Sequence, residues 1–385
     1  VPWGRRGVAL LVFLALVAAL LASLPSRAAA ACSGNAIVCE NQLPGTPASE
    51  WDIDGAGDES IQGFATKISV NAGSQIQFKI DTNATSYSIK IYRLGYYQGD
   101  GARLVTTIAP SANLPQSQPA CATDPDTQIY DCGNWAVSAS WNVPSSAVSG
   151  VYFAHLIRSN GDSSHIPFVV RNDGNTSKVL FQTSDTTWQA YNNYGGSNFY
   201  TGPDGRATKL SYNRPWSTRG SSNGRDFLFS NEYPMIRFLE QNGYDLSYVS
   251  GLDTHLDPNL ITKHRLFLSV GHDEYWSKDQ RDHVLAARDA GTNLAFFSGN
   301  EVYWKTRWEE SQDGSHTPNR TLVCYKDTWN NTQIDPVTPT ATWRDPRFGD
   351  LGYGPENALT GTMYKANSVD LPIKVSSAEG KLRLW

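Results

Sequence analysis

Five consecutive residues in the second half of the chain include four side chains that can bind metal or move protons. They are His272, Asp273, Glu274, Tyr275 and Trp276. Imidazole and carboxylate groups serve as general acids and bases, and oxygen ligands suit hard metal ions. Each residue also has a structural interpretation, because acidic side chains favour a helix N-terminus and aromatic rings fill packing space. Their crowding into one turn favours a functional site.

The turn lies between an apolar run and a helical pattern. Residues 265–271 read Arg-Leu-Phe-Leu-Ser-Val-Gly, which is typical of a buried parallel strand. Ser277 and Gln280 have the spacing of a capping box, which predicts a helix from Ser277 to Ala290 that ends at Gly291. Ligands of open parallel sheets bind outside the carboxyl ends of the strands, where this turn should lie.

Alternating strands and helices surround this unit and predict a parallel, three-layered sheet. Strands are expected over 178–181, 245–249, 265–270 and 293–298, and helices over 232–242, 258–264 and 277–290. Because each helix then begins at the carboxyl edge, Tyr233 and Tyr275 should face one crevice, together with Asn300 and Glu301. A long excursion rich in Gly, Ser, Asn and aromatic residues, ending near Phe229, should cover this edge.

Two phenols and nearby carboxylates would form a site made of oxygen donors. A phenol with a pKa of about 10 ionises at neutral pH only when a strong Lewis acid holds it. Ferric iron does this better than zinc or magnesium, and zinc prefers nitrogen and sulfur ligands. The residues therefore point to iron (Fe3+).

The first half of the chain has a different pattern. Arg5 and Arg6, an apolar run and four alanines predict a signal peptide over 1–31, and therefore a secreted protein. Seven short segments with period-two alternation follow, which favours an immunoglobulin- or fibronectin-like β-sandwich over 32–172. The polar segment 172–175 reads as a linker. The chain ends at 382–385 in what resembles the middle of a strand, so we expect a truncated second domain over 176–385.

The cysteines and the net charge limit the compartment and the partners that we expect. In an oxidising compartment Cys32 should pair with Cys39 and Cys121 with Cys132, which leaves Cys324 as a buried structural thiol. The net charge of −5 becomes −8 once three arginines leave with the signal peptide, and no basic stripe remains. We therefore expect no nucleic-acid partner and no membrane span in the mature chain. A homo-oligomer stays open.

From Lys178 onward the chain resembles the amidotransferase-like domain of the N,N-dimethylformamidase large (beta) subunit family. Three motifs carry the resemblance: Val-Gly-His-Asp-Glu-Tyr-Trp-Ser at 270–277, Ser-Gly-Asn-Glu-Val-Tyr-Trp at 298–304 and Gly-Pro-Glu-Asn-Ala-Leu at 354–359. The preceding sandwich is similar to the domain that accompanies this fold in secreted bacterial relatives.

The resemblance implies one iron held by two tyrosines and a glutamate, and the hydrolysis of small amides. Tyr275 matches the tyrosine of the first motif, and Tyr233 matches the tyrosine at the start of the preceding long helix. Glu356 matches the glutamate by order and spacing, with Glu301 and Glu274 as competitors. The implied fold is glutamine amidotransferase-like.

Such an enzyme would use the iron to polarise an amide and activate water. His272 or a second carboxylate, Glu274 or Glu301, would move protons, with Asn300 as a further catalytic candidate. Thiol catalysis looks excluded because the turn after the central strand carries no cysteine, and no Gly-x-Ser-x-Gly elbow supports a serine triad. The substrate would be a small amide or a polymer.

A second class of function is a secreted binding module whose aromatic loops, 188–200 and 212–216, contact glycan or cell-wall polymer. A third is a degenerate relative that has kept the fold and lost activity. Metal separates the first two, because a binding module gives no reason for tyrosines to share iron. The sequence thus predicts a secreted, iron-dependent hydrolase of C–N bonds.

Overall fold

The computed structural model of the protein describes residues 32–220, 226–348, 354–366, 372 and 374–381. The predicted signal peptide over 1–31 and the terminal segment 382–385 lie outside the described residues. No helix in the described ranges is long and apolar enough to cross a membrane.

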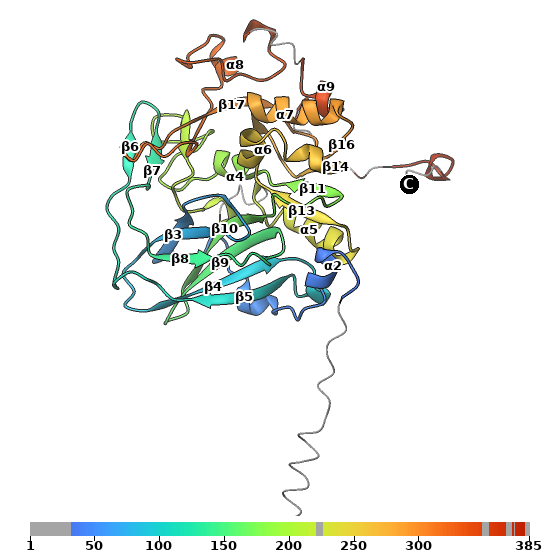
Figure 1. The fold of residues 1–385 in the computed structure, drawn as a ribbon. Helices are drawn as coiled ribbons and strands as arrows, with labels where there is room; N and C mark the ends of the chain where they lie inside the picture. The colour runs from blue at the N-terminus through green and yellow to red at the C-terminus, as the bar shows by residue number, and fades with distance from the viewer. Residues whose placement is uncertain (1–31, 221–225, 349–353, 367–371, 373, 382–385) are drawn as a thin grey trace, which may run out of the picture. The chain divides into compact units, whose positions relative to one another are not determined.

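Two sheets that share an apolar core form the first part of the fold (Figure 1). One sheet has the order β1 (Ile61–Ala65), β3 (Gln75–Thr82), β8 (Ala139–Asn142). The other has the order β2 (Ser69–Asn71), β10 (Ser163–Arg171), β9 (Gly150–Arg158), β4 (Tyr87–Leu94), β5 (Ala102–Ile108). Alternate residues of β3 are buried, as expected for a sheet with one face on a core. Phe78 of β3 thus meets Phe168 of β10, with ring centroids 5.7 Å apart.

Short elements lie around the sandwich. They are α2 (Ala36–Glu40), α3 (Ala48–Trp51), η1 (Tyr97–Gly99) and the hairpin of β6 (Ala122–Asp124) and β7 (Ile129–Asp131). The predicted disulfide between Cys121 and Cys132 closes this hairpin. Cys32 and Cys39 are also disulfide-bonded, and Cys324 is free and buried, as expected.

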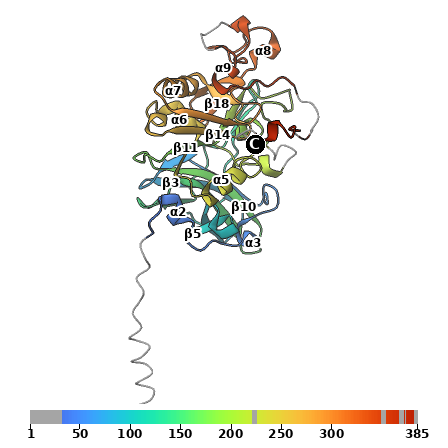
Figure 2. The same cartoon turned by 90° about the vertical axis from the view of Figure 1, so that its right-hand side faces the viewer.

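A four-stranded parallel sheet follows, in the order β13 (Leu246–Val249), β11 (Val179–Gln182), β14 (Leu266–Val270), β16 (Asn293–Phe297). All four residues of β11 are buried, because helices cover one face and sandwich strands lie beyond the other. Figures 1 and 2 show α6 (Gly251–Leu256) and α7 (Lys278–Asp289) on the side of β11 opposite the sandwich. The helices α4 (Asp185–Ala190) and α5 (Glu232–Gln241) complete this part.

A second, mixed sheet has the order β12 (Lys209–Ser211), β18 (Thr321–Val323), β17 (Trp304–Glu309), β15 (Tyr275–Ser277). Here β15 runs parallel to β17, while the other two pairs are antiparallel. The remaining elements are short: η2 (Thr218–Gly220), η4 (Ile261–Lys263), α8 (Asp327–Asn330), η5 (Pro346–Phe348), α9 (Asn357–Thr360) and η6 (Glu379–Lys381).

The predicted fold class, a three-layer parallel α/β fold behind a sandwich, is wrong. Among the described sheets only the one containing β11 is wholly parallel, the others are antiparallel or mixed, and the helices are few and short. Two departures explain the error. The segment 275–277 continues as a strand instead of passing directly into the helix, and 258–264 forms only a 3-10 turn at 261–263.

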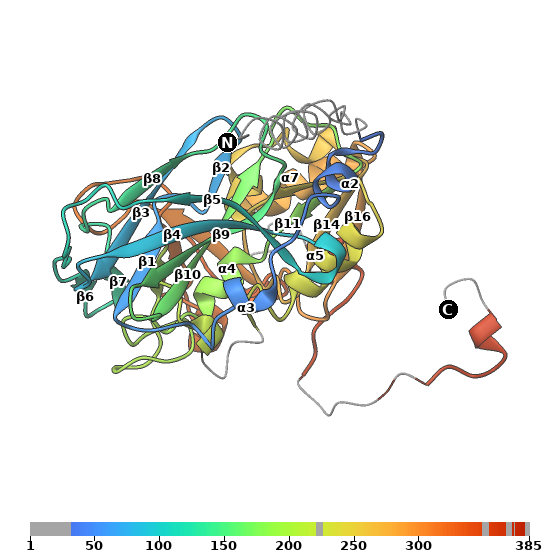
Figure 3. The ribbon, with the colours of Figure 1, turned by 90° about the horizontal axis from the view of Figure 1, so that it is seen from below.

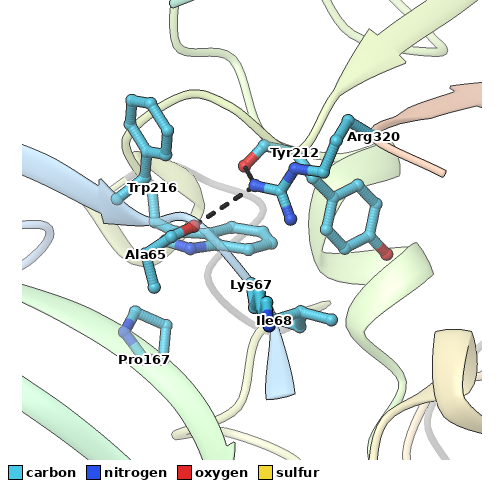
Figure 4. Close-up of a pocket in the computed structure, with 8 residues that line it drawn as sticks. Ala65, Lys67, Ile68, Pro167, Tyr212, Trp216 and Arg320 are labelled. Atoms are coloured by element: carbon cyan, nitrogen blue, oxygen red, sulfur yellow. Dashed lines mark hydrogen bonds between the residues drawn. The ribbon is translucent and has the colours of Figure 1, made fainter. Parts of the chain in front are cut away.

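One core extends across the sandwich and the parallel sheet. Trp51 and Phe153 belong to the same buried cluster as Phe181 and Tyr248, and the described residues from Asn35 onward form one compact unit. Figure 3 shows β4, β9 and β10 running side by side. A small cavity of about 10 Å³ lies between the sandwich and the mixed sheet, where Arg320 donates to the carbonyl oxygens of Ala65 (3.2 Å) and Tyr212 (2.8 Å) (Figure 4).

Candidate functional site

The turn that contains residues 272–276 begins with a glycine that no other residue replaces easily. Gly271 follows the last residue of β14 with a φ of +80°, and a Cβ there would lie 2.6 Å from the Cβ of Asn231. The chain turns sharply at this point, so the side chains of His272 and Glu274 leave the sheet edge before β15 begins. Ser277 then caps α7 by accepting a hydrogen bond from the backbone N–H of Gln280, at 3.2 Å.

Three phenols and one carboxylate meet beside this turn, and we refer to Tyr191, Tyr200, Tyr275 and Glu274 as the tyrosine cluster. The hydroxyl of Tyr275 donates to that of Tyr200 (2.7 Å), which lies 3.0 and 2.9 Å from the two carboxylate oxygens of Glu274. The hydroxyl of Tyr191 lies 3.0 Å from that of Tyr200 and 3.1 Å from Oε2 of Glu274. Four side chains thus direct oxygen atoms into one small volume.

The three tyrosines of the cluster lie at the end of a helix, in a loop and in a strand. Tyr191 is the C-cap of α4, and Tyr200 lies nine residues further on in the aromatic-rich excursion. Their rings stack with centroids 4.6 Å apart. Tyr275 is fully buried as the first residue of β15, where it pairs with Trp304 of β17. The excursion therefore contacts the turn, as its length and composition predict.

Burial makes the phenols of the cluster hard to ionise. Desolvation raises the pKa of both Tyr200 and Tyr275 well above its usual range, and the nearby carboxylate of Glu274 raises it further. An isolated phenolate would therefore be strongly disfavoured here. The cluster is a place where a cation would change the ionisation of two tyrosines at once.

A buried lysine borders the same cluster. The ammonium of Lys326 lies 3.5 Å from the ring centroid of Tyr200, 4.2 Å from that of Trp329 and 4.8 Å from that of Trp304. Its Nζ has no hydrogen-bond partner among the residues that the structure describes. Desolvation lowers the pKa of Lys326 to about 7, against the opposing effect of the Glu274 carboxylate.

His272 links the cluster to two further polar residues. Its Nδ1 lies 2.9 Å from Oδ1 of Asp226, and its Nε2 lies 3.2 Å from Oε2 of Glu274 and 2.8 Å from Nδ2 of Asn300. Burial lowers the pKa of His272, but the carboxylates of Glu274 and Asp226 outweigh it, so the pKa is raised. The ring is 21% exposed, so it is accessible to a small molecule.

Of the predicted residues, the structure brings His272, Glu274, Asn300 and Tyr275 together. Glu301 is buried nearby after β16, and neither of its carboxylate oxygens has a hydrogen-bond partner within the described ranges. Desolvation, and then the charge of Asp273, raises the pKa of Glu301 to about 10. No hydrogen bond of the described residues joins Glu301 to the tyrosine cluster.

The other two predicted metal ligands lie elsewhere. Tyr233 packs against Trp51 and Phe229, with ring centroids 6.0 and 5.7 Å away, and accepts a hydrogen bond from Nη1 of Arg237 (3.3 Å). The residue before it on α5, Glu232, points inward instead and accepts from Nε1 of Trp188 (2.8 Å). Successive side chains on an α-helix point about 100° apart, so Tyr233 and Glu232 point in different directions.

Glu356 is buried in an ion pair with Arg344, whose Nε lies 3.0 Å from Oε2. In the described part of the chain no contact joins Tyr233, Tyr275 and Glu356, so the structure does not assemble the predicted ligand set. Among the residues that the structure describes there is also no group of three or more His, Cys, Asp or Glu side chains placed to bind a metal. The donors that converge are chiefly phenols.

Sequence reasoning missed four residues of the site: Tyr191, Tyr200, Asp226 and Lys326. All four lie in segments without regular periodicity, where no pattern fixes the direction of a side chain. The available signal was the length of the excursion and its three tyrosines between residues 191 and 200.

An open, mainly apolar groove of about 530 Å³ borders the turn. It is lined by Val270 and Gly271 at the end of β14, by Phe297 of β16 and by the first two turns of α5. The groove lies on the side of Gly271 that faces Asn231, and gives a small molecule a route to the sheet edge.

Three solved structures resemble the chain only weakly. An alkylpurine DNA glycosylase AlkC from Pseudomonas fluorescens is 14% identical (TM-score 0.19) over 30% of this chain and 32% of that chain. An uncharacterized protein from Bacillus anthracis str. Ames is 15% identical (TM-score 0.18; 30% and 84% covered), and a superoxide reductase from Ignicoccus hospitalis is 10% identical (TM-score 0.18; 32% and 86% covered). The chain spans about a third of the first of these.

Among curated proteins no significant match was found. A family model does match, over residues 88–385, which is well over half of the chain and includes strands of the sandwich. On this match the chain belongs to the N,N-dimethylformamidase beta subunit-like family, whose C-terminal region the model describes.

Proposed function

We propose that the protein is an iron-dependent hydrolase of C–N bonds in amides, with the metal at the tyrosine cluster. Membership of the dimethylformamidase beta subunit-like family supports hydrolysis of an amide. The observation that carries the proposal is the convergence of the Tyr200 and Tyr275 hydroxyls with the Glu274 carboxylate. Tyr275 therefore stays a proposed ligand, while Tyr200 takes the place of Tyr233 and Glu274 that of Glu356.

The donor set fits iron on three grounds. All of its donors are oxygen, which suits a hard ion and does not suit zinc. Oxygen ligands bonded to one ion at about 2 Å lie about 3 Å apart, and the hydroxyl oxygen of Tyr200 lies 2.7 Å from that of Tyr275 and 3.0 Å from Oε1 of Glu274. Phenols whose pKa is raised by burial need a strong Lewis acid if they are to act as phenolates.

His272 is the proposed proton carrier. Bound iron supplies Lewis acidity, which polarises an amide carbonyl and lowers the pKa of water. Asp226 holds Nδ1 of His272, so Nε2 is the atom that takes a proton and returns it to the leaving nitrogen. Asn300, 2.8 Å from Nε2, orients the ring. The raised pKa of His272 suits donation to an amine leaving group.

Lys326 adjusts the charge of the site. Its ammonium lies over the Tyr200 ring and within 5.4 Å of the Tyr275 ring centroid, so in the protonated form it favours the phenolates. The same aromatic surroundings exclude water from that side of the cluster. Lys326 therefore supports anionic tyrosines without a direct hydrogen bond to them.

The aromatic loops argue against the glycan-binding alternative. Trp188, Tyr212 and Trp216 are 1%, 3% and 8% exposed, so their faces are covered by the protein and cannot stack on a sugar. Tyr191 and Tyr200 are turned onto Glu274. We do not retain the binding module as a second function.

We also propose that the protein acts outside the cytoplasm. Its disulfide-bonded cysteines are of a kind that persists in oxidising compartments. The expected signal peptide over 1–31 supports the same location. Detection of the processed chain in the culture medium would test it.

An amide-hydrolysis assay tests the proposed reaction. Iron-loaded protein should release amine from at least one member of a panel of small linear amides that includes N,N-dimethylformamide. Glu274→Gln should abolish the release, whereas Glu310→Gln, at an exposed carboxylate outside the cluster, should leave it unchanged. A panel without any amine release, together with full iron binding by Glu274→Gln, would overturn the proposal.

A further inference from the structure

A fully buried arginine lies behind the loop that carries Tyr191 and Tyr200. Arg214 is 0% exposed and makes five hydrogen bonds. Its Nη1 donates to the carbonyl oxygens of Tyr194 (2.8 Å) and Ser197 (3.1 Å). Its Nη2 donates to those of Asn192 (2.9 Å) and Gln189 (3.4 Å), and its Nε to Oε1 of Gln189 (3.2 Å).

All five acceptors belong to one short stretch of chain, residues 189–197. This stretch contains Tyr191 and ends three residues before Tyr200. It includes Gly195 and Gly196, both at positive φ, and the carbonyl oxygens of Asn192, Tyr194 and Ser197 accept no backbone hydrogen bond among the described residues. The carbonyl oxygen of Gln189, in α4, also accepts from the backbone N–H of Asn192 (3.0 Å). A planar guanidinium is the side chain able to serve several converging carbonyl oxygens at once.

Burying the charge of Arg214 costs free energy, so the hydrogen bonds it makes at this position must offset that cost. Among the described residues no carboxylate is hydrogen-bonded to Arg214, and desolvation lowers its pKa to about 9. Carbonyl and amide oxygens accept all five of its hydrogen bonds, and the charge of Asp131 offsets part of the desolvation. An arginine is almost never fully buried unless it is paired. A purely apolar side chain at 214 would leave the carbonyl oxygens of three residues, Asn192, Tyr194 and Ser197, without the donors they have here.

We propose that Arg214 is the positioning residue of the tyrosine cluster: its guanidinium fixes the loop 189–197 and thereby sets the separation of the Tyr191 and Tyr200 hydroxyls on Glu274. The iron-related part of this inference depends on the proposed function. The ordering of the loop does not, and it can be measured on metal-free protein.

The boundary between the sandwich and the mixed sheet offers a matched control. Arg320 is also buried, donates to the carbonyl oxygens of Ala65 and Tyr212 and to Oδ1 of Asn213, and has a pKa lowered by burial to about 10 (Figure 4). None of its acceptors lies in 189–197. Arg320→Lys therefore removes a buried guanidinium that donates to carbonyl oxygens, as Arg214→Lys does, but breaks no hydrogen bond to residues 189–197.

The experiment compares Arg214→Lys, Arg214→Gln and Arg320→Lys. In metal-free protein, hydrogen exchange of the amides in 190–201, such as those of Asn198 and Phe199, should be roughly tenfold faster in the Arg214 variants than in wild type, with β14 unchanged. After iron loading, the tyrosinate-to-iron absorption band should shift or weaken in these variants alone.

Arg214→Lys keeps the charge and is the variant expected to stay folded if Arg214→Gln does not. A folded Arg214→Lys protein with wild-type exchange in 190–201 and a wild-type band would overturn the inference. So would equal loosening of the loop in Arg320→Lys. Absence of iron from the wild-type protein would defeat the proposed function and leave the exchange comparison to decide the role of Arg214.

Discussion

The hydroxyl of Tyr275 lies 2.7 Å from that of Tyr200, although 75 residues separate them in the chain. Tyr275 is held by the pairing of β15 with β17, and Tyr200 by a loop fastened through Arg214. Two independent supports therefore fix one contact, and Glu274 lies within hydrogen-bond distance of Tyr200. This contact is the centre of the proposed metal site.

Cys324 should be dispensable for activity. Its thiol is fully buried, and burial raises its pKa to about 12, so it is protonated at neutral pH and a poor nucleophile. Its only acceptors among the described residues are the carbonyl oxygens of Lys305 and Thr340, each 3.9 Å away. Cys324→Ser should keep amide hydrolysis within about twofold of wild type and change stability by about 1 kcal/mol. A folded but inactive Cys324→Ser enzyme would contradict the metal-based reaction.

Glu232 should make stability depend on pH. Burial raises the pKa of this carboxyl from 4.5 to about 7, against the lowering effect of its hydrogen bonds from Ser184 and Trp188. Between these two pH values the folded state binds more protons than the unfolded state, so the Glu232 contribution to stability falls as the pH rises from about 4.5 to about 7 and is level above that.

Glu232→Gln removes this titration and keeps the acceptor oxygen. Urea unfolding at pH 5, 6, 7 and 8 should therefore show the variant gaining stability relative to wild type up to pH 7 and no further. A difference between the two proteins that stays constant over this range would show that Glu232 does not titrate as described.

The disulfide of the β6–β7 hairpin should stabilise the site from the sandwich side. The hairpin contacts the excursion where Ser197 donates to the carbonyl oxygen of Gln128 (2.6 Å) and Thr208 donates to that of Thr127 (3.0 Å). Replacing Cys121 and Cys132 by serine should cost about 2–4 kcal/mol of unfolding free energy and lower iron occupancy. Denaturation of the double variant, with Cys324→Ser as the control, measures this. Wild-type stability in the double variant would rule out the supporting role of the hairpin.

Elements that are determined by their local sequence could be predicted from the sequence. The central strand and the helix capped by Ser277 are confirmed, because an apolar run, a glycine at positive φ and a capping residue act locally. Family membership followed from the motif around Tyr275 and is confirmed over 88–385.

The rest depended on contacts that no local pattern encodes. The strand 275–277 exists because β17 lies beside it, which turned the expected α/β unit into part of a mixed sheet. Tyr233 was expected at the sheet edge, but the rotation of α5 directs its ring to Trp51. Tyr200 enters the site through a loop whose path depends on Arg214 and on the hairpin.

The position of the metal is the central claim, and iron analysis of four proteins tests it most directly. Elemental mass spectrometry and visible absorption would be measured on wild type, Tyr200→Phe, Tyr275→Phe and Tyr233→Phe, all of which keep the aromatic ring. Wild type and Tyr233→Phe should hold near-stoichiometric iron with a tyrosinate-to-iron band, whereas Tyr200→Phe and Tyr275→Phe should each lose the band and most of the iron. Wild-type protein without iron after anaerobic loading, or a band lost only in Tyr233→Phe, would contradict the account.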